Sequence, residues 1–473
     1  MADLPEGLLD ALAAAVGAEN LRTGADVNED HSHDEALTVG WQMPDAVVLP
    51  TTTAQVADVL RLAADHRIPV TPRGSGTGLS GACVPTDGGI VVAFEAMNRV
   101  LEIDTENHMA VVQPGVTLEQ LNAELAPHGF FYPVSPGENS ASLGGNVATN
   151  AGGMRAVKYG VTRHHVLGLE AVLPGGDVIR TGGKLVKTSA GYDLTQLIIG
   201  SEGTLAVVTE VTVKLQPKLD HRSTLLVPFA TLDEVAHAVP RIVGSGVGPL
   251  MTEYIDLITM AGITEAAGLD LGLPQEIKDG ALAYLVVALE ARREEQLDAD
   301  TAEVAELVTE LGALEVYVLP PAAATQLIEA RERAFWVAKA NGANDIVDTV
   351  VPRASIPAFL TTVADLAAAH DAWVVGCGHA GDGNVHLSIF QADDAVRATL
   401  IKAIFRSAID HGGAISGEHG IGSEKQPYFL DLEDPAKLAL MRRIKAAFDP
   451  AGILNPGTLL DTEPIDATPE AAR

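Results

Sequence analysis

A glycine-rich run near the start of the chain limits the folds that the chain can adopt. The run, PRGSGTGLSG at 72–81, contains a literal G-x-G-x-x-G at Gly76, Gly78 and Gly81. In the Rossmann fingerprint such glycines open a helix that faces a pyrophosphate. Here ACVPTDGG at 82–89 follows instead, and its proline and paired glycines favour direct passage into a strand. The sequence therefore argues against a Rossmann fold.

The same run keeps the chemistry of an anion site. Residues without a Cβ let backbone N–H groups converge on an anion, and Ser75, Thr77 and Ser80 add hydroxyl donors. A solvent-exposed turn is the alternative interpretation of this run alone, because glycine runs are common in turns. We expect a pyrophosphate cradle that has no helix.

A second run, SLGGNVATNAGG at 142–153, is interpreted as another glycine loop, this time with amide side chains. Asn146 and Asn150 each donate and accept hydrogen bonds, which suits the polar edge of a ring or a ribityl chain. One such run is weak evidence for a ligand. Two runs in one α/β region favour a large phosphate-bearing cofactor.

Histidines gather in two motifs near the other end of the chain, GHAGDGNVH at 378–386 and GEHG at 417–420. Asp-Gly is a favoured turn dipeptide, so we expect a hairpin that brings His379 and His386 together across two strands. Glu418 would complete a donor set for Zn²⁺ or a similar metal. Neighbouring side chains of an extended segment point to opposite sides, so His419 is free to face a substrate. Histidines that only support the fold are the alternative.

Composition restricts the class of partner. A formal net charge of -32 argues against binding to nucleic acid or to anionic lipid, because both depend on Lys and Arg. The only two cysteines, Cys83 and Cys377, give no disulfide framework. Neither a signal-peptide pattern nor an apolar run of about 18 residues is visible. We expect a cytoplasmic protein without a transmembrane segment, and leave peripheral attachment to a membrane open.

The pattern of elements changes near residues 216–218, where alternating short strands and helices give way to longer helices separated by single strands. We therefore place an N-terminal domain at 1–218, with its core at about 44–218, and a second domain at 219–415. The second domain is expected to be an antiparallel sheet backed by helices on one face. Residues 461–473 are expected to form a frayed tail.

Seven motifs together resemble one enzyme family. They are PRGSGTGLSGA, SLGGNVATNAGG, KYGVT, GSEGTLAVVTEVTVKL, GHAGDGNVH, SGEHGIG and GILNPG. In this order they resemble the flavin-dependent 2-hydroxyacid dehydrogenases of the vanillyl-alcohol oxidase superfamily. The chain is similar to the branch with D-lactate dehydrogenase, D-2-hydroxyglutarate dehydrogenase and the glycolate oxidase flavin subunit.

This resemblance covers roughly residues 40–460 and implies an α+β fold. It implies an FAD-binding domain of the p-cresol methylhydroxylase (PCMH) type, built of two α/β subdomains, and a cap domain whose antiparallel sheet is covered by helices. Residues 416–460 would return to the FAD-binding domain.

The resemblance also implies extended FAD, with its pyrophosphate over the first glycine run and its ring reached by the second. Thr77 stands where some members of the superfamily have a histidine that attaches the flavin, so we expect non-covalent FAD. The residues that match the family's cofactor positions are Pro72, Arg73, Gly74, Ser75, Gly76, Thr77, Gly78, Ser80, Gly81, Pro136, Gly137, Gly144, Gly145, Asn146, Thr149, Asn150, Gly152, Gly153, Gly160, Val161, Glu202, Gly203, Val208 and Asn455.

The family likewise implies a divalent metal on His379, His386 and Glu418. Zn²⁺ is expected and Mn²⁺ is left open. The metal would hold and polarise the hydroxyl group of a 2-hydroxy acid, His419 would take its proton, and the α-hydride would pass to FAD. Arg331 matches the arginine that pairs with the substrate carboxylate.

Three positions bear on the substrate. Where hydroxyglutarate enzymes have a threonine, a lysine and an asparagine, this chain has Phe335, Ile346 and Ser388. Losing a cation disfavours a second carboxylate, because an unpaired buried charge is costly. We expect a short D-2-hydroxy monocarboxylate, D-lactate first, with Ser388 contacting it. D-2-hydroxyglutarate dehydrogenase and glycolate oxidase flavin subunit remain alternatives, as does a metal-dependent hydrolase or lyase without flavin chemistry.

The sequence has no cysteine cluster for an Fe–S centre. Electrons would therefore leave through a quinone, a cytochrome, an electron-transfer flavoprotein or a partner subunit. A homodimer is left open.

Overall fold

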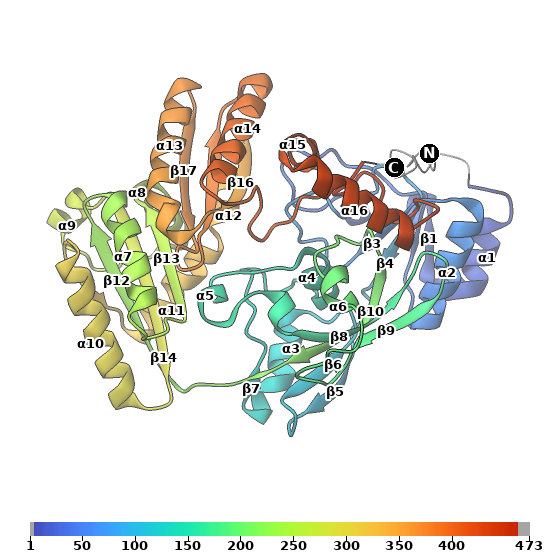
Figure 1. Ribbon diagram of the computed structural model, residues 1–473, viewed down its shortest axis with the longest axis horizontal. Coiled ribbons are helices and arrows are strands. Elements are labelled where there is room, and N and C mark those ends of the chain that lie inside the picture. The colour runs from blue at the N-terminus through green and yellow to red at the C-terminus, as the bar shows by residue number, and fades with distance from the viewer. Residues whose placement is uncertain (1–3, 462–473) are drawn as a thin grey trace, which may run out of the picture.

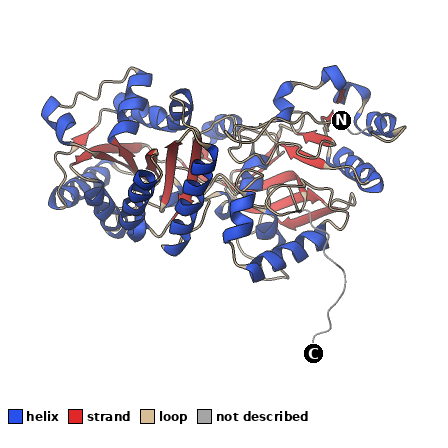
Figure 2. Ribbon diagram, turned by 90° about the horizontal axis from the view of Figure 1, so that it is seen from above, coloured by secondary structure: helices blue, strands red, loops and turns tan. Residues whose placement is uncertain are grey.

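The computed structural model describes residues 4–461, which form two halves lying side by side (Figure 1, Figure 2). The N-terminal half contains two main sheets, and the cap half contains one seven-stranded sheet. No helix among residues 4–461 is long and apolar enough to cross a membrane.

The first sheet has the strand order β1-β2-β4-β3. Its strands are β1 (Leu21–Thr23), β2 (Ala46–Val48), β4 (Ile90–Ala93) and β3 (Val70–Arg73). β4 pairs in parallel with β2 and β3 and is buried along its whole length, as its apolar sequence IVVA requires. Helices α1 (Leu8–Val16) and α2 (Thr53–His66) share the core of this sheet. The chain between β3 and β4 has no α-helix, as expected from the first glycine run.

The second sheet is antiparallel and has the order β5-β6-β10-β8-β9. Its strands are β5 (Val100–Asp104), β6 (Met109–Val112), β10 (Val207–Lys214), β8 (Val166–Val172) and β9 (Val178–Gly182). The elements that accompany it are α3 (Leu118–Leu125), α4 (Leu143–Thr149), α5 (Ala156–Tyr159), α6 (Leu194–Ile198), and the short pair β7 (Phe130–Phe131) and β11 (Gln216–Pro217).

Helix α4 corrects the interpretation of the second glycine run as a loop. Ser142 is the N-cap, and its Oγ accepts a hydrogen bond from Gly145 N at 3.3 Å. Leu143 and Val147, four residues apart, are buried in the core of the second sheet. This packing stabilises a helix that its glycines disfavour, and the sequence pattern alone does not show such a contact.

The sheet of the cap half has the order β15-β12-β14-β13-β17-β18-β16, and all its pairs are antiparallel. The strands are β12 (His221–Phe229), β13 (Met251–Asp256), β14 (Ala283–Ala291), β15 (Tyr317–Val318), β16 (Asp345–Val350), β17 (Trp373–Gly378) and β18 (Asn384–Phe390). The helices are α7 (Leu232–Gly244), α8 (Leu257–Ala267), α9 (Gln275–Gly280), α10 (Glu294–Glu310), α11 (Pro321–Glu332), α12 (Ala334–Ala340), α13 (Ile356–Ala369) and α14 (Asp394–Asp410).

Helices pack on both faces of this sheet, so the expectation of helices on one face is wrong. Leu225 and Val227 of β12 belong to the core that includes α7, α10, α13 and α14. Leu226, between them, belongs to a second core with α8 and α11. Alternate residues of a strand point to opposite faces, so both faces of β12 are covered.

The C-terminal segment contacts both halves. It contains α15 (Gln426–Leu432) and α16 (Pro435–Phe448), which lie over the N-terminal half in Figure 1. Phe429 and Leu438 join the core of the cap half, whereas Ile453 and Leu454 join the core of the first sheet. The expected frayed tail falls almost wholly outside the described residues, at 462–473.

Candidate active site

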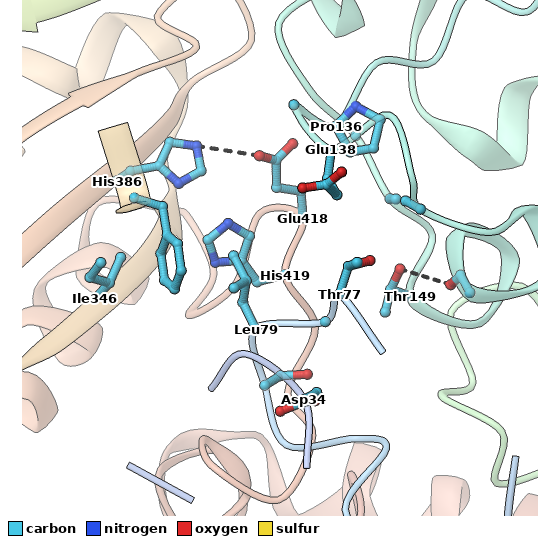
Figure 3. A pocket seen from close by; sticks show the side chains of 18 of the residues that line it. Asp34, Thr77, Leu79, Pro136, Glu138, Thr149, Ile346, His386, Glu418 and His419 are labelled. Carbon is cyan, nitrogen blue, oxygen red and sulfur yellow. Dashed lines mark hydrogen bonds and ion pairs between the residues drawn. The ribbon is translucent and has the colours of Figure 1, made fainter. Parts of the chain in front are cut away.

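A cavity of about 810 Å³ lies between the two halves (Figure 3). Residues 72–80, helices α4, α8 and α12, and strands β17 and β18 contribute to its wall. All the residues predicted to bind metal or substrate or to act as base line it, namely Arg331, His379, His386, Ser388, Glu418 and His419. The structure therefore brings the glycine runs and the histidine motifs to one site.

Glycines give the first loop its shape. A Cβ on Gly74 would lie 2.1 Å from Ser142 Oγ at the start of α4. Gly76 has a φ of 73°, in the left-handed region, and a Cβ there would lie 2.0 Å from Arg73 Nη2. The Arg73 Nη1 donates to the carbonyl of His33 at 2.7 Å. Without side chains at these positions, the loop can pack against α4 and Arg73.

Two buried polar atoms of the glycine runs have no protein partner. They are Asn146 Nδ2 in α4 and Ser80 Oγ in the first loop. Buried polar atoms nearly always form hydrogen bonds, so these two fit a wall made for a polar ligand. Together with the size of the cavity and the close approach of the glycine loop, they fit FAD.

Most of the predicted cofactor residues line the cavity. They are Pro72, Arg73, Gly74, Ser75, Gly76, Thr77, Gly78, Ser80, Pro136, Gly137, Gly144, Gly145, Asn146, Thr149, Gly152, Glu202, Gly203 and Val208. The structure places the others outside the lining, namely Gly81, Asn150, Gly153, Gly160, Val161 and Asn455.

Glu202 and Asn455 hold the C-terminal segment in place. The carboxylate of Glu202 accepts hydrogen bonds from Ile421 N at 2.8 Å and from Gly422 N at 2.6 Å. Asn455 Nδ2 donates to the carbonyls of Glu202 at 2.7 Å and Ala82 at 2.9 Å. These bonds give both side chains a structural role that the motifs did not indicate.

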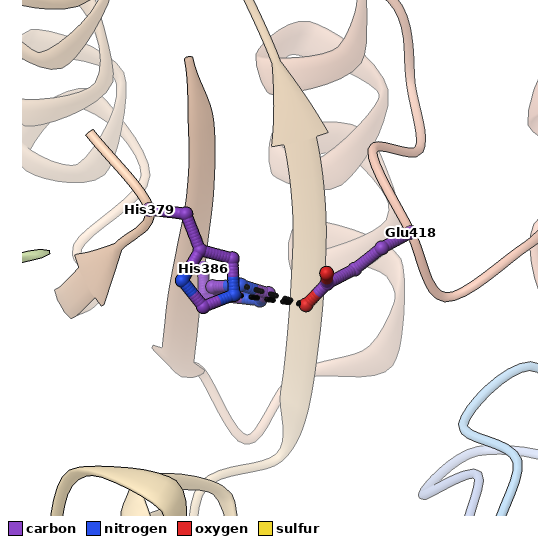
Figure 4. A group of neighbouring side chains, drawn as sticks. All are labelled: His379, His386 and Glu418. Carbon is purple, nitrogen blue, oxygen red and sulfur yellow. Dashed lines mark hydrogen bonds and ion pairs between the residues drawn. The ribbon is translucent and has the colours of Figure 1, made fainter. Parts of the chain in front are cut away.

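Three potential metal ligands converge on one point (Figure 4). Glu418 Oε1 lies 3.1 Å from His379 Nε2 and 3.3 Å from His386 Nε2, and the ligand atoms all lie within 4.8 Å of one another. His379 follows β17, and His386 pairs with Cys377 in the expected β17–β18 hairpin. Two imidazole nitrogens and a carboxylate oxygen fit Zn²⁺ or Mn²⁺ and leave coordination positions open.

Glu253 of β13 links His379 to Arg331. Its Oε1 lies 2.8 Å from His379 Nδ1, and its Oε2 lies 2.9 Å from Arg331 Nη2. Burial alone would lower the pKa of His379, but the charges of Glu253 and Glu418 raise it well above its usual value. A carboxylate on Nδ1 leaves Nε2 of His379 directed at the metal position.

Asp348 of β16 fixes the loop that carries Glu418 and His419. Its Oδ2 accepts hydrogen bonds from Ser416 Oγ and from the backbone N–H groups of residues 417–419, at 2.8–3.0 Å. Its Oδ1 accepts from Asn384 Nδ2 at the start of β18. One fully buried carboxylate thus connects the hairpin with the loop of the candidate base.

His419 lies beside the ligand group and is held differently. Its ring centroid is 5.1 Å from that of His386, and its Nδ1 lies 4.0 Å from Asp348 Oδ2. Burial lowers the pKa of His419 to about 4. The imidazole is therefore neutral near pH 7 and has a free lone pair for a proton.

Arg331 and the three substrate positions lie in the same cavity. The Arg331 guanidinium is buried, and its Nε has no hydrogen-bond partner. Phe335, Ile346 and Ser388 also line the cavity. In Figure 3, Ile346 lies on the His386 side, across from Thr77 and Thr149 of the glycine runs.

Glu253 and Asp348 were not predicted from the sequence. Each is an acid inside an apolar strand, TEYID at 252–256 and DIVDTVV at 345–351. An acid at the centre of a strand-forming run signals a buried charge that needs partners. The partners of Glu253 and Asp348 are distant in the sequence, so this signal does not identify the partners.

Known proteins resemble the chain over most of its length. The FAD binding domain family matches residues 44–182, and the C-terminal domain of FAD linked oxidases matches residues 218–459. An uncharacterized FAD-linked oxidoreductase of Mycobacterium tuberculosis is 58% identical, covering 94% of this chain and 97% of that protein. The glycolate oxidase subunit GlcD of Bacillus subtilis is 41% identical, covering 88% and 89%. The D-lactate dehydrogenase of Anaerostipes hadrus is 37% identical, covering 94% and 95%.

The structure of p-cresol methylhydroxylase with substrate bound has a TM-score of 0.78 at 20% identity, covering 97% of this chain and 98% of that chain. This likeness confirms the expected α+β fold with a PCMH-type FAD-binding part. The chain therefore belongs to the FAD-linked oxidase family and is an FAD-linked oxidoreductase of the branch that includes D-lactate dehydrogenase and GlcD.

Proposed function

We propose that the protein oxidises a D-2-hydroxy monocarboxylate, D-lactate first, to the 2-oxo acid. The main observation is that Arg331, His419 and the group His379, His386 and Glu418 line the same cavity as the FAD-binding glycine runs. A carboxylate anchor, a base and a metal-ligand set are the parts that this reaction needs.

Arg331 would bind the substrate carboxylate. A guanidinium presents a planar fork of donors that matches a carboxylate, and its Nε is buried without a hydrogen-bond partner. The ion pair with Glu253 holds the side chain at the cavity wall. The substrate is thereby oriented with its 2-carbon near His419.

His419 would accept the hydroxyl proton. Its Nδ1 is the nitrogen nearer to Asp348, so we assign Nε2 as the atom that takes the proton. The backbone N–H of His419 donates to Asp348 at 2.8 Å, which keeps the loop from moving away.

When bound, non-covalent FAD supplies a two-electron acceptor, and a divalent cation on His379, His386 and Glu418, Zn²⁺ first, supplies a Lewis acid for the hydroxyl oxygen. Thr77 lies at the cavity wall, at the position where some members of the superfamily have the histidine that attaches the flavin. A threonine hydroxyl does not form that covalent bond, which supports non-covalent FAD. The alternative function, a hydrolase or lyase without flavin chemistry, does not fit a chain that belongs to the FAD-linked oxidase family.

The charges of the cavity favour one carboxylate over two. Among the described residues that line the cavity, the only Lys or Arg side chains are those of Arg73 and Arg331. Arg73 belongs to the glycine loop. Ile346 stands where the hydroxyglutarate enzymes have a lysine, so a second carboxylate would lack a cation there. D-2-hydroxyglutarate and glycolate remain the alternative substrates.

Three finer points belong to this proposal. Residues 1–218 would form the FAD-binding domain and 219–415 the cap, with 416–460 joining the two. The net charge of -32 and the two free cysteines suit a soluble cytoplasmic enzyme. The electron acceptor would be a quinone, a cytochrome, an electron-transfer flavoprotein or a partner subunit.

Flavin absorbance tests the proposal directly. Purified protein should be yellow and should bleach under anaerobic conditions when D-lactate is added. Treatment with a chelator should slow the bleaching, and added Zn²⁺ or Mn²⁺ should restore it. A faster reaction with D-2-hydroxyglutarate than with D-lactate would contradict the substrate assignment, and colourless protein that does not take up FAD would contradict the function.

A further inference from the structure

Two buried carboxyl groups, one from each half of the molecule, hold a single loop. Residues 416–424, which we call the bridging loop, carry the candidate metal ligand Glu418 and the candidate base His419. Asp348 of the cap half accepts hydrogen bonds from three backbone N–H groups in the first part of this loop. Glu202 of the N-terminal half accepts from two N–H groups in its second part, at 2.8 and 2.6 Å. The positions of Glu418 and His419 therefore depend on both halves.

Both glycine runs also contact the bridging loop. In the first run, the carbonyl of Ser80 accepts a hydrogen bond from Glu424 N at 3.0 Å. In the second run, Gly152 lies so close to Glu418 that an added Cβ would be 2.7 Å from Oε2 of that glutamate. Ser80 and Gly152 both line the cavity that fits FAD. The wall of the cofactor site and the loop of the metal site are thus in direct contact.

Glu202 has a backbone conformation that needs support from its surroundings. Its φ of 52° lies in the left-handed region, which is unfavourable for a residue with a Cβ. Such a conformation persists only where the surrounding structure holds it. The backbone N–H of Glu202 donates to the carbonyl of Ala148 in α4 at 2.8 Å, and both residues line the cavity. A cofactor packed against them would stabilise Glu202 in the conformation that binds the bridging loop.

We propose that FAD and the divalent cation bind cooperatively, and that Glu202 transmits the effect through the bridging loop. FAD between the glycine runs holds Glu202 in place, and Glu202 holds the loop, so Glu418 is already positioned when the cation arrives. The entropy of ordering the loop is then lost once instead of twice. This inference rests on the FAD and metal sites of the proposed function and adds the coupling between them. Glu202 acts as a positioning residue, through the loop.

Zinc titrations with and without FAD test the inference on the full-length protein. Calorimetry of chelator-treated protein should give a zinc dissociation constant about tenfold lower, or more, in the FAD-loaded form than in the FAD-free form. Because the two binding equilibria are linked, zinc should lower the dissociation constant of FAD by the same factor. Hydrogen exchange at the backbone N–H groups of Ile421 and Gly422 should slow when FAD binds.

Two buried glutamates of the N-terminal half provide a matched pair of variants. Glu202→Gln keeps the shape of the side chain but turns one acceptor oxygen into an amide NH₂, which cannot accept from a backbone N–H. The effect of FAD on zinc affinity should then fall to about twofold or less. Glu170 is buried to a similar degree but lies outside the cavity lining, so Glu170→Gln should leave the effect unchanged.

The outcomes separate this inference from the proposed function. Equal zinc affinity with and without FAD overturns the inference and leaves both sites intact. No zinc binding in either form overturns the proposed metal site and the inference with it. A full effect of FAD in Glu202→Gln means that the coupling passes directly across the cavity, and the role of Glu202 is wrong. If Glu202→Gln does not fold, unchanged hydrogen exchange at Ile421 and Gly422 in the wild-type protein overturns the inference.

Discussion

Glu253 Oε1 lies 2.8 Å from His379 Nδ1, and both side chains are buried. The other oxygen of the same carboxylate faces Arg331 at 2.9 Å. One side chain thus orients both a candidate metal ligand and the candidate carboxylate anchor. Changes at Glu253 should therefore affect metal and substrate together.

Glu253→Gln should weaken the binding of Zn²⁺ about 10- to 100-fold, because a carboxylate behind a ligating histidine fixes its ring and increases its basicity. Calorimetric titration of metal-free protein measures this affinity. Glu265→Gln is the control, since Glu265 is also in the cavity lining but is exposed on α8. Equal zinc affinity in wild type and Glu253→Gln would show that Glu253 does not orient His379.

His419→Asn should keep flavin and metal but lose flavin reduction by D-lactate, by a factor of roughly 10² to 10⁴. The backbone N–H of residue 419 still donates to Asp348, so the loop should remain in place. Stopped-flow absorbance gives the rate, and metal analysis gives the occupancy. His237→Asn, on the exposed side of α7, is the control. A near-normal rate in His419→Asn would assign the base to another residue.

The metal-ligand group could be predicted because its signals are local. The Asp-Gly turn between His379 and His386 sets the hairpin, and the hairpin brings the two rings to 4.9 Å, centroid to centroid. Glu418 and His419 were predicted from the second histidine motif, GEHG at 417–420, and from the family resemblance. The structure brings all four into one cavity wall.

The supporting carboxylates could not be predicted in the same way. Glu253 is 126 residues from His379, and Asp348 is 71 residues from His419, so only the folded chain shows these pairs. Helix α4 was missed for a related reason. Its glycines favour a loop locally, and the burial of Leu143 and Val147 against the second sheet outweighs that preference.

Gly76→Ala should weaken FAD binding. Its φ of 73° costs an alanine about 1–2 kcal/mol, and the new Cβ would displace the Arg73 guanidinium from the cradle. Fluorescence titration of the apoprotein with FAD measures the affinity. Gly7→Ala isolates the backbone cost, because Gly7 has a φ of 80° with no atom within 4 Å of an added Cβ. An equal and small loss of stability in both variants, with unchanged FAD affinity, would contradict a role for Gly76 in the cradle.

Asp345 and Asp348 lie three residues apart on β16. Replacing each carboxylate with a neutral amide should change the free energy of unfolding in opposite directions. Burial, followed by the charge of Glu424, raises the pKa of Asp345 from 3.8 to about 6. The folded state then binds a proton more tightly than the unfolded state. The stabilisation of the folded state by this tighter proton binding is fully present below about pH 4 and is lost as pH rises through about 6.

For Asp348, burial would also raise the pKa, but His419 and His386 lower it below its usual value. Its stabilising contribution is therefore present above the unfolded pKa and is lost only in strong acid. Asp345→Asn should raise the free energy of unfolding at pH 8 by up to about 3 kcal/mol, whereas Asp348→Asn should lower it by about 1–3 kcal/mol, because its Oδ2 accepts from three backbone N–H groups.

Urea unfolding at pH 4 and pH 8 measures both effects. The advantage of Asp345→Asn should shrink to about 0.5 kcal/mol at pH 4, where the wild-type carboxyl group is protonated in the folded state and only partly ionised in the unfolded state. Oδ1 of the asparagine still accepts from Ile346 N, which Asp345 binds at 2.9 Å, so the strand keeps its local hydrogen bond. A loss of stability in Asp345→Asn at pH 8 would mean that its contact with Arg397, 3.9 Å away, outweighs the cost of burying the charge.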